Sequence, residues 1–232
     1  MDYFQCKKED RSFPRLLKSI NKCPEELFYC GDIGIANDMP CIAIIGSRKA
    51  TKNGLDMAYS LGKIASKEGF AVVNGLAVGC DTMAFRGALS EGGKCIAILP
   101  GGLDCIYPRE NERLSSDILE SGGCLISEYG MGIRPQRSYY VNRDRLQSGI
   151  SVGVIVAETA EKGGTMHTVR FAEKQSRRLA CYYSRLHKNA SGNQIMVDRG
   201  IGVPLESESS IKDFLDSVRD VSRISYEQLS FL

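Results

Sequence analysis

Short apolar runs alternate with longer amphipathic segments along most of this chain. Residues 42–45 read Ile-Ala-Ile-Ile and residues 70–73 read Phe-Ala-Val-Val, without a polar residue in either run. Uninterrupted apolar runs of this length are typical of strands buried on both faces of a sheet. The segment between them predicts an amphipathic helix, because its apolar residues follow a spacing of three and four. These residues are Met57, Leu61, Ile64 and Ala65.

The same alternation continues beyond the first two strands and defines the fold class. Strands are predicted at residues 42–46, 70–74, 95–99, 124–127, 153–157 and 179–183. Helices are predicted at about residues 53–68, 80–92, 110–121, 164–177 and 209–217. Strict alternation of helices with buried strands predicts an α/β fold with a doubly wound, mostly parallel sheet.

Three segments fall outside this alternation. Residues 1–40 are expected to form an N-terminal extension with a short helix near residues 12–20 and an edge strand within 24–32. The core domain then covers residues 41–217, and residues 218–232 form a tail. Residues 130–151 contain few apolar side chains and are predicted to be a long functional loop.

Composition narrows the function classes only slightly. The formal net charge of +2 means that binding to nucleic acid must depend on local clusters of basic residues. Nine cysteines without zinc-ligand spacing indicate reduced, buried thiols in a cytoplasmic protein, and no metal or cofactor is expected. No apolar run reaches the length of a membrane span, so no membrane partner is expected.

Four predicted strands are followed by glycine-bearing turns that lead towards a helix. Such turns let backbone N–H groups approach an anion closely, and in parallel sheets they meet at one edge. The sequence therefore predicts a phosphate site, although glycines also serve simply as tight connections. None of the turns matches a dinucleotide fingerprint or a P-loop. The turns are Gly46–Arg48, Gly75–Gly79, Pro100–Asp104 and Gly163–Thr165.

Basic residues gather in two further places. Arg134, Arg137, Arg143 and Arg145 lie in the predicted loop, together with Tyr139 and Tyr140. Arginine with tyrosine is the combination that binds single-stranded nucleic acid through phosphates and stacked bases, and the alternative is a loop that only aids solubility. The second group either forms a similar surface or is a solvated helix face. It contains Arg170, Lys174, Arg177, Arg178, Arg185 and Lys188.

No catalytic constellation is visible, and no enzyme is expected. The two histidines are His167 and His187, and His167 is expected to have a structural or phosphate-contacting role. Glu158 follows a predicted strand and is expected to orient loop backbone or cap a helix. Asp81 is expected to cap or charge the first turn of its helix.

A series of motifs along the chain resembles the DNA-processing protein A (DprA/Smf) family over about residues 13–205. The resemblance rests on their order and spacing. They are Ile42–Arg48, Asn74–Asp81, Gly101–Asn111, Ser127–Tyr129, Asn142–Ser151 and Ser191–Ile195, with Leu27–Asp32 similar to the family's lead-in strand.

This resemblance implies an extended Rossmann-like fold that binds single-stranded DNA, forms a homodimer and loads a RecA-type recombinase in natural transformation. It predicts a member that holds the core domain only. Two departures from the family occur: Asp144 replaces an asparagine between two arginines, and His167 follows the Gly163–Met166 turn. The candidate DNA or phosphate residues are Gly46, Ser47, Arg48, Lys49, Gly75, Gly79, Gly101, Gly102, Arg143, Arg145, Gly163, Gly164, Thr165 and His167, with Tyr139 and Tyr140 for base stacking.

Two other functions stay open. The same superfamily resembles nucleotide sensors and Lonely-Guy phosphoribohydrolases, in which glycine turns hold a nucleotide and a carboxylate such as Glu158 acts. The Pro100–Asp104 turn lacks the continuation that such an active site uses. The third possibility is an interaction protein with a vestigial sheet edge, which would bind neither DNA nor a nucleotide.

Overall fold

The computed structural model describes residues 2–184 and 190–229. In this part of the chain one sheet of nine strands runs in the order β1-β2-β6-β5-β4-β3-β7-β8-β9. The strands from β3 to β9 pair in parallel, whereas β1 and β2 are antiparallel additions beside β6. Their bounds are β1 Phe4–Lys7, β2 Glu26–Gly31, β3 Cys41–Ile45, β4 Ala71–Asn74, β5 Cys95–Leu99, β6 Cys124–Ser127, β7 Gly153–Val156, β8 Arg178–Tyr182 and β9 Val203–Leu205.

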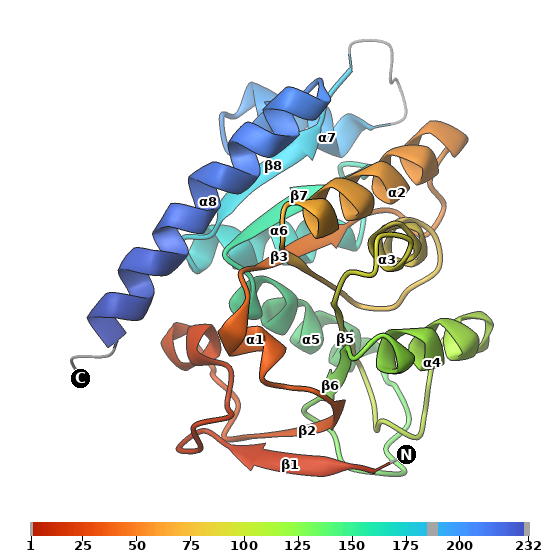
Figure 1. Ribbon diagram of the computed structural model, residues 1–232. Coiled ribbons are helices and arrows are strands. Elements are labelled where there is room, and N and C mark those ends of the chain that lie inside the picture. Colours follow the sequence, from red (N-terminus) through yellow and green to blue (C-terminus); the bar gives the residue numbers. More distant parts are fainter. Residues whose placement is uncertain (1, 185–189, 230–232) are drawn as a thin grey trace.

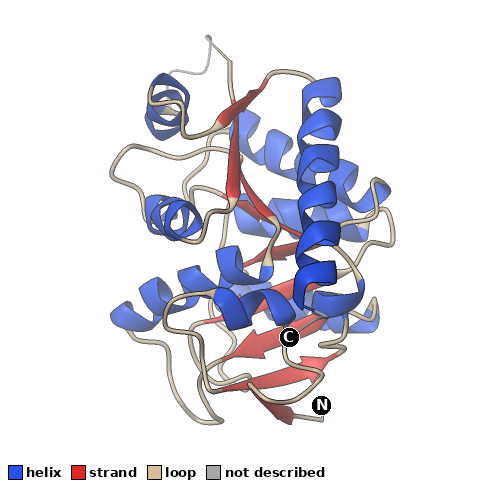
Figure 2. Cartoon of the chain, turned by 90° about the vertical axis from the view of Figure 1, so that its left-hand side faces the viewer, coloured by secondary structure: helices blue, strands red, loops and turns tan. Residues whose placement is uncertain are grey.

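Helices cover both faces of this sheet (Figures 1 and 2). Helices α2, α3, α4 and α8 contribute to one core, whereas α1, α5, α6 and α7 contribute to the two cores on the other face. The predicted doubly wound α/β fold is therefore confirmed. The helices are α1 Ile35–Asp38, α2 Lys52–Lys67, α3 Cys80–Leu89, α4 Glu112–Glu120, α5 Arg137–Ile150, α6 Thr165–Lys174, α7 Ser191–Asp198 and α8 Glu208–Leu229, with short 3-10 helices at Arg15–Ser19 and Arg109–Asn111.

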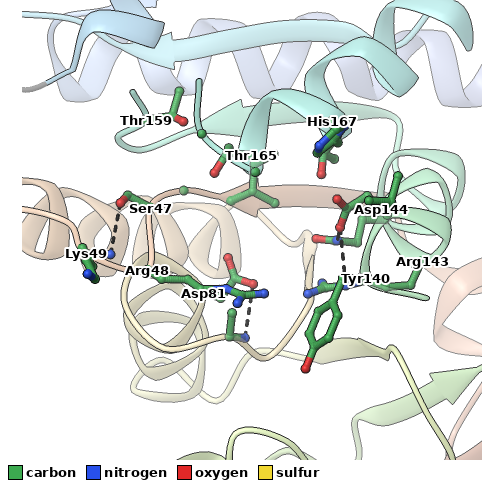
Figure 3. A pocket seen from close by; sticks show the side chains of 18 of the residues that line it. Ser47, Arg48, Lys49, Asp81, Tyr140, Arg143, Asp144, Thr159, Thr165 and His167 are labelled. Carbon is green, nitrogen blue, oxygen red and sulfur yellow. Dashed lines mark hydrogen bonds and ion pairs between the residues drawn. The ribbon is translucent and has the colours of Figure 1, made fainter. Parts of the chain in front are cut away.

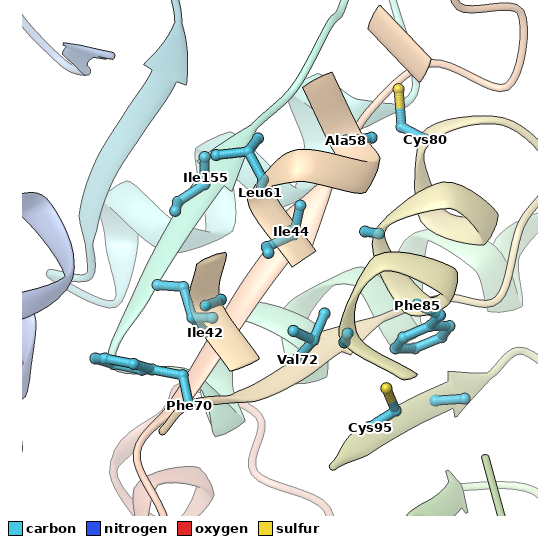
Figure 4. Close-up of a cluster of buried hydrophobic side chains, with 14 of the residues drawn as sticks. Ile42, Ile44, Ala58, Leu61, Phe70, Val72, Cys80, Phe85, Cys95 and Ile155 are labelled. Carbon is cyan, nitrogen blue, oxygen red and sulfur yellow. The ribbon is translucent and has the colours of Figure 1, made fainter. Parts of the chain in front are cut away.

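Strand β3 lies at the centre and buries side chains on both faces. Ile42 and Ile44 pack in the core beneath α2 and α3, which Figure 4 shows with Leu61 and Phe85. The alternating residue Ala43 packs in the opposite core. Alternate residues of a strand point to opposite faces, so a strand covered on both sides must be apolar throughout. This is the reason that the run of residues 42–45 carries no polar residue.

The strand order reverses between β3 and β7, which are neighbours in the sheet although far apart in sequence. From β3 the chain moves outwards through β4, β5 and β6, and then returns to place β7 on the other side of β3. At such a reversal the loops after two adjacent strands diverge, and a crevice opens outside their carboxyl ends. The loops that follow β3 and β7 therefore define the place for a ligand.

The prediction of a long loop over residues 130–151 was wrong. Most of it is helix α5, the crossover between β6 and β7. Four of its six buried residues recur at helical spacing, but two of these four are polar, so the stripe lacks the expected apolar signal. They are Arg143, Leu146, Gln147 and Ile150.

The ends of the chain also differ from the expectation. β2 is not an edge strand, because β1 pairs along its outer side. The short elements α1, α7 and β9 were not predicted, and α8 extends through much of the expected tail to Leu229. Since β1 and β2 belong to the same sheet as the core, the domain division at residue 40 stays a prediction. Arg185, His187 and Lys188 lie outside the described residues.

No helix within residues 2–184 and 190–229 combines the length of a membrane span with sufficient apolar character.

Candidate nucleic-acid interface

A cavity of about 750 Å³ lies at the crevice where the strand order reverses. Figure 3 shows that three parts of the chain form its walls. The loop after β3 contributes Ser47, Arg48 and Lys49, and helix α5 contributes a wall that includes Arg143. The loop after β7 and the start of α6 supply the third wall, which includes Thr165.

The loop after β3 is held in one conformation by residues around it. Glu158, which is 3% exposed, accepts hydrogen bonds from the Thr51 backbone N–H (2.8 Å) and the Thr51 hydroxyl (2.5 Å). The Ser47 N–H donates to the Glu158 carbonyl oxygen at 2.7 Å. Glu158 therefore orients this loop and the start of α2, which confirms the role expected from the sequence.

A glycine at the end of β3 permits the close packing of this loop on α3. A Cβ at Gly46 would lie 2.5 Å from the Cys80 sulfur, and one at Gly79 would lie 2.4 Å from the Ser47 carbonyl oxygen. Gly79 also has a φ of +87°, which side-chain-bearing residues rarely adopt. These two glycines allow close contact between the loop after β3 and the start of α3. Of the two, only Gly46 lines the cavity.

Arg143 is a buried cation at the cavity floor, with a side chain only 5% exposed. Its guanidinium fills the space that a side chain at Gly75 would take, since a Cβ there would lie 1.1 Å from Arg143 Nη1. Its Nε lies 3.4 Å from a carboxylate oxygen of Asp144. The positive charge of Arg143 also acts on Asp81. Arg143 thus contacts one carboxylate and interacts electrostatically with a second, and both neutralise part of its charge.

Burial raises the pKa of both carboxylates. Asp81 accepts hydrogen bonds from the backbone N–H groups of Gly75 (3.1 Å) and Ala77 (3.3 Å), and burial raises its pKa despite Arg143. It lies in the first turn of α3, as expected. Asp144 accepts a hydrogen bond from Gln147 Nε2 at 2.9 Å, and burial raises its pKa to about 6. The negative charge of Asp144 is therefore sensitive to pH near neutrality.

Arg48 extends from its loop across the cavity mouth and stacks on Tyr140. The guanidinium carbon lies 5.1 Å from the centroid of the ring, within the range of a cation–π contact. A smaller cavity of about 180 Å³ lies next to this pair and is lined by Gly75, Tyr107 and Tyr140 among others. The Arg48–Tyr140 stack thus borders both cavities.

The third wall is the loop after β7. Gly163, Gly164, Thr165 and His167 line the cavity where α6 begins. The N-terminus of a helix carries a partial positive charge and directs backbone N–H groups outwards, so this wall suits an anion. A Cβ at Gly164 would meet no atom within 4 Å, so close approach by the chain itself does not explain this glycine.

The structure brings most of the predicted residues together. Those lining the large cavity are Gly46, Ser47, Arg48, Lys49, Tyr140, Arg143, Gly163, Gly164, Thr165 and His167, and Gly75 lines the small one.

Four further candidates have other contacts. Arg145 donates to the Glu128 carboxylate, with one pair of atoms 2.6 Å apart, and to two backbone carbonyl oxygens. Tyr139 stacks on Tyr129 with ring centroids 4.0 Å apart. Gly101 and Gly102 pack closely against the 130–135 segment. None of these residues lines either described cavity.

The second basic cluster is mainly structural where the structure describes it. Arg177 donates hydrogen bonds to the carbonyl oxygens of Leu16, Ser148 and Gly149, and burial lowers its pKa. Arg178 lies over the ring of Phe214. Arg170 and Lys174 are exposed on α6. The solvated or structural alternative for this cluster is therefore the better one.

Several cavity residues were not selected from the sequence. Tyr107, Gln147, Thr159 and Thr168 line the large cavity although no glycine turn or basic cluster marks them. Gln147 was detectable only through the helical spacing of α5, one turn after Arg143. No group of three or more His, Cys, Asp or Glu side chains suited to a metal ion occurs among the described residues.

The chain was compared with known proteins. The family model for DNA recombination-mediator protein A matches residues 5–216. Protein Smf from Synechocystis sp. is 34% identical over 172 residues, which are 73% of this chain and 43% of that protein. DNA processing protein DprA from Streptococcus pneumoniae is 36% identical over 170 residues, which are 72% of this chain and 58% of that protein. This chain thus spans about half the length of these relatives.

Two solved structures agree closely with the fold. The crystal structure of the S. pneumoniae protein matches with a TM-score of 0.84 and 30% identity, covering 92% of this chain and 74% of that one. A structure of DNA processing protein A from Helicobacter pylori, described for its single-stranded-DNA binding mode, matches with a TM-score of 0.83 and 25% identity, covering 95% and 97%. Sequence and fold together lead to one conclusion: this chain belongs to the DNA recombination-mediator protein A family.

Proposed function

We propose that this protein binds single-stranded DNA at the large cavity and acts in DNA processing. The observation that carries the proposal is the charge of the cavity walls. Arg48, Lys49, Arg137 and Arg143 line it, against the two carboxylates of Asp81 and Asp144. The excess of cations over carboxylates in these walls, together with the N-terminus of α6, favours phosphates. The described DNA-binding mode of the H. pylori relative supports the same reading.

The aromatic residues favour a single strand over a duplex. Tyr140 lies inside the cavity and Tyr107, which is 54% exposed, lies at the border of both cavities. Rings at such positions can stack on the bases of a single strand. In a duplex the faces of the bases are covered by the neighbouring base pairs. Phosphates would therefore lie along the loops after β3 and β7, with bases towards Tyr107 and Tyr140.

The finer part of the proposal is that a homodimer passes the bound strand to a RecA-type recombinase during DNA uptake. It rests on family membership alone. Light scattering would measure the oligomeric state. Recombinase filament formation on strands coated with a single-strand-binding protein would measure loading. A monomer that fails to accelerate filament formation would contradict this part while leaving DNA binding intact.

The phosphoribohydrolase alternative is less well supported. The Pro100–Asp104 turn, which would have to contribute to a nucleotide active site, packs through Gly101 and Gly102 on the 130–135 segment. Glu158 is occupied by the Thr51 backbone and hydroxyl groups. A simple test is the release of adenine from AMP, which we expect not to occur.

Replacing Arg48 with alanine tests the proposed site directly. R48A should weaken binding to single strands by about tenfold whatever their sequence, and reduce the magnitude of the log–log salt slope by about 0.7, because it removes one phosphate contact. The matched control is R113A, since Arg113 on α4 is 77% exposed and lies outside both cavities. Equal affinities of R48A and R113A would contradict the proposed site.

A further inference from the structure

One group in the cavity does not fit a purely phosphate-binding surface. The side chain of Asp144 is 14% exposed and lines the cavity wall. Its Oδ1 atom accepts from Gln147 Nε2 at 2.9 Å and lies 3.4 Å from Arg143 Nε. No described interaction involves the second carboxylate oxygen. In Figure 3 the carboxylate lies within the cavity between Arg143 and His167.

An ionised carboxylate accepts hydrogen bonds and cannot donate one. A phosphate placed against it would be repelled, so the ligand group there must carry a donor. The large cavity has the volume of a small-molecule site and accommodates a nucleotide with its base. Phosphates are attracted to the cationic loop after β3 and to the N-terminus of α6, which leaves the base as the part of a strand that reaches Asp144.

We propose that Asp144 is a specificity-determining residue that accepts a hydrogen bond from the exocyclic amino group of a DNA base. This inference rests on the proposed single-stranded-DNA function. Cytosine presents such an amino donor, and acidic side chains pair with it in known complexes. Thymine presents a carbonyl oxygen at the same position, which a carboxylate repels. The cavity should therefore prefer bases with an amino group over thymine.

The test compares two pyrimidine strands that differ mainly in this group. Anisotropy titrations use labelled oligo-dC and oligo-dT of about 12 nucleotides at pH 8, where Asp144 is ionised and oligo-dC stays unfolded. The wild-type protein should bind oligo-dC about tenfold more tightly. D144N, which keeps the shape of the side chain but adds a donor, should bind oligo-dT more tightly and lose the preference.

The control variant is D117N, since Asp117 lies on α4 outside both cavities and pairs with Arg113. It should behave like the wild-type protein. Equal wild-type affinity for the two strands, or a preference that persists in D144N, would overturn the inference while leaving DNA binding intact. Failure of the wild-type protein to bind either strand would overturn the proposed function and this inference with it. The wild-type comparison needs no variant, so it stands even if D144N is unstable.

Discussion

At the scale of single residues, the site depends on a buried arginine. Arg143 is placed by the absence of a side chain at Gly75 and by the carboxylates of Asp81 and Asp144. Burying a cation is costly unless opposite charges surround it. The two carboxylates therefore stabilise the folded site, and they also reduce its attraction for phosphate. Arg48, on the more open loop after β3, is the cation with the greater freedom to meet a ligand.

The pKa of Asp144 predicts a pH dependence of DNA binding. Because burial raises that pKa to about 6, the carboxylate is charged at pH 8 and mostly neutral at pH 5.5. Loss of this negative charge should strengthen binding of single strands by about fivefold, corresponding to roughly 1 kcal/mol of Coulomb energy. Anisotropy titrations at both pH values with oligo-dT measure the change.

Two variants isolate the contribution of Asp144 to this change. D144N should already bind oligo-dT tightly at pH 8 and respond less to acid. H167Q removes the imidazole that lines the same cavity but leaves Asp144 unchanged. This variant should therefore still bind oligo-dT more tightly at pH 5.5 than at pH 8. If the wild-type protein bound oligo-dT more weakly at pH 5.5 than at pH 8, the proposed effect of the Asp144 charge would be contradicted.

Arg145 is predicted to contribute to stability rather than to DNA binding. Its guanidinium pairs with Glu128 and donates to the carbonyl oxygens of Lys22 and Asn142. R145A should lower the free energy of unfolding by about 2 kcal/mol, because it leaves Glu128 partly buried without its partner. The affinity of R145A for single strands should stay within about twofold of the wild-type affinity. Urea unfolding followed by circular dichroism, with anisotropy in parallel, measures both quantities.

The opposite pattern would assign Arg145 to the DNA. A tenfold weaker affinity with unchanged stability would mean that the Glu128 pair opens when a strand binds. The sequence alone placed Arg143 and Arg145 in the same group. They separate only because α5 turns one towards the cavity and the other towards Glu128.

At the scale of elements, helix α5 shows what a sequence pattern can miss. Its buried stripe contains Arg143, Leu146, Gln147 and Ile150, in which polar and apolar residues alternate, with Ser148 and Gly149 buried beside it. The polar members face the cavity, and the apolar members pack in the sheet core. An apolar-periodicity analysis recognises only half of such a stripe. The same feature that hid the helix from prediction is the one that builds the site.

The hydrogen bonds that Thr51, the N-cap residue of α2, donates to Glu158 give a stability test at the element scale. Glu158 accepts the Thr51 N–H and hydroxyl at the start of α2 and is almost fully buried. E158A should lower the free energy of unfolding by about 1–3 kcal/mol, because buried donors lose their acceptor. It should also weaken DNA binding, since the loop carrying Arg48 is no longer fixed.

The neighbouring residue Glu161 provides the control. It is exposed, and its backbone N–H rather than its side chain bonds to Ser191. E161A should leave the urea midpoint almost unchanged. If E158A unfolded at the same urea concentration as E161A, the stabilising role of Glu158 at the start of α2 would be refuted.

At the scale of the whole molecule, the strand order decides where the site forms. Apolar runs predicted the six central strands, and glycine turns predicted the edge of the sheet at which the large cavity lies. The reversal between β3 and β7 was not encoded in any local pattern, because it depends on α5 carrying the chain back across the sheet. The local sequence alone does not distinguish the glycine turn after β5 from the turns after β3 and β7. The three-dimensional order excludes Gly101 and Gly102 from the cavities.

The termini were hard to predict for a related reason. β1 and β9 are strands of four and three residues at the two edges, with exposed positions that break the apolar run. Their pairing depends on the neighbouring strand and not on their own sequence.

The central claim is that the cavity binds single-stranded DNA through its phosphates. The most direct test is an anisotropy titration of labelled oligo-dT with the wild-type protein at two salt concentrations, with a duplex of the same length and AMP as competitors. Binding should weaken steeply with salt, with a log–log slope of about −0.7 for each phosphate contacted, and neither competitor should displace the strand at equal nucleotide concentration. Absence of binding, an affinity independent of salt, or displacement by AMP would contradict this claim.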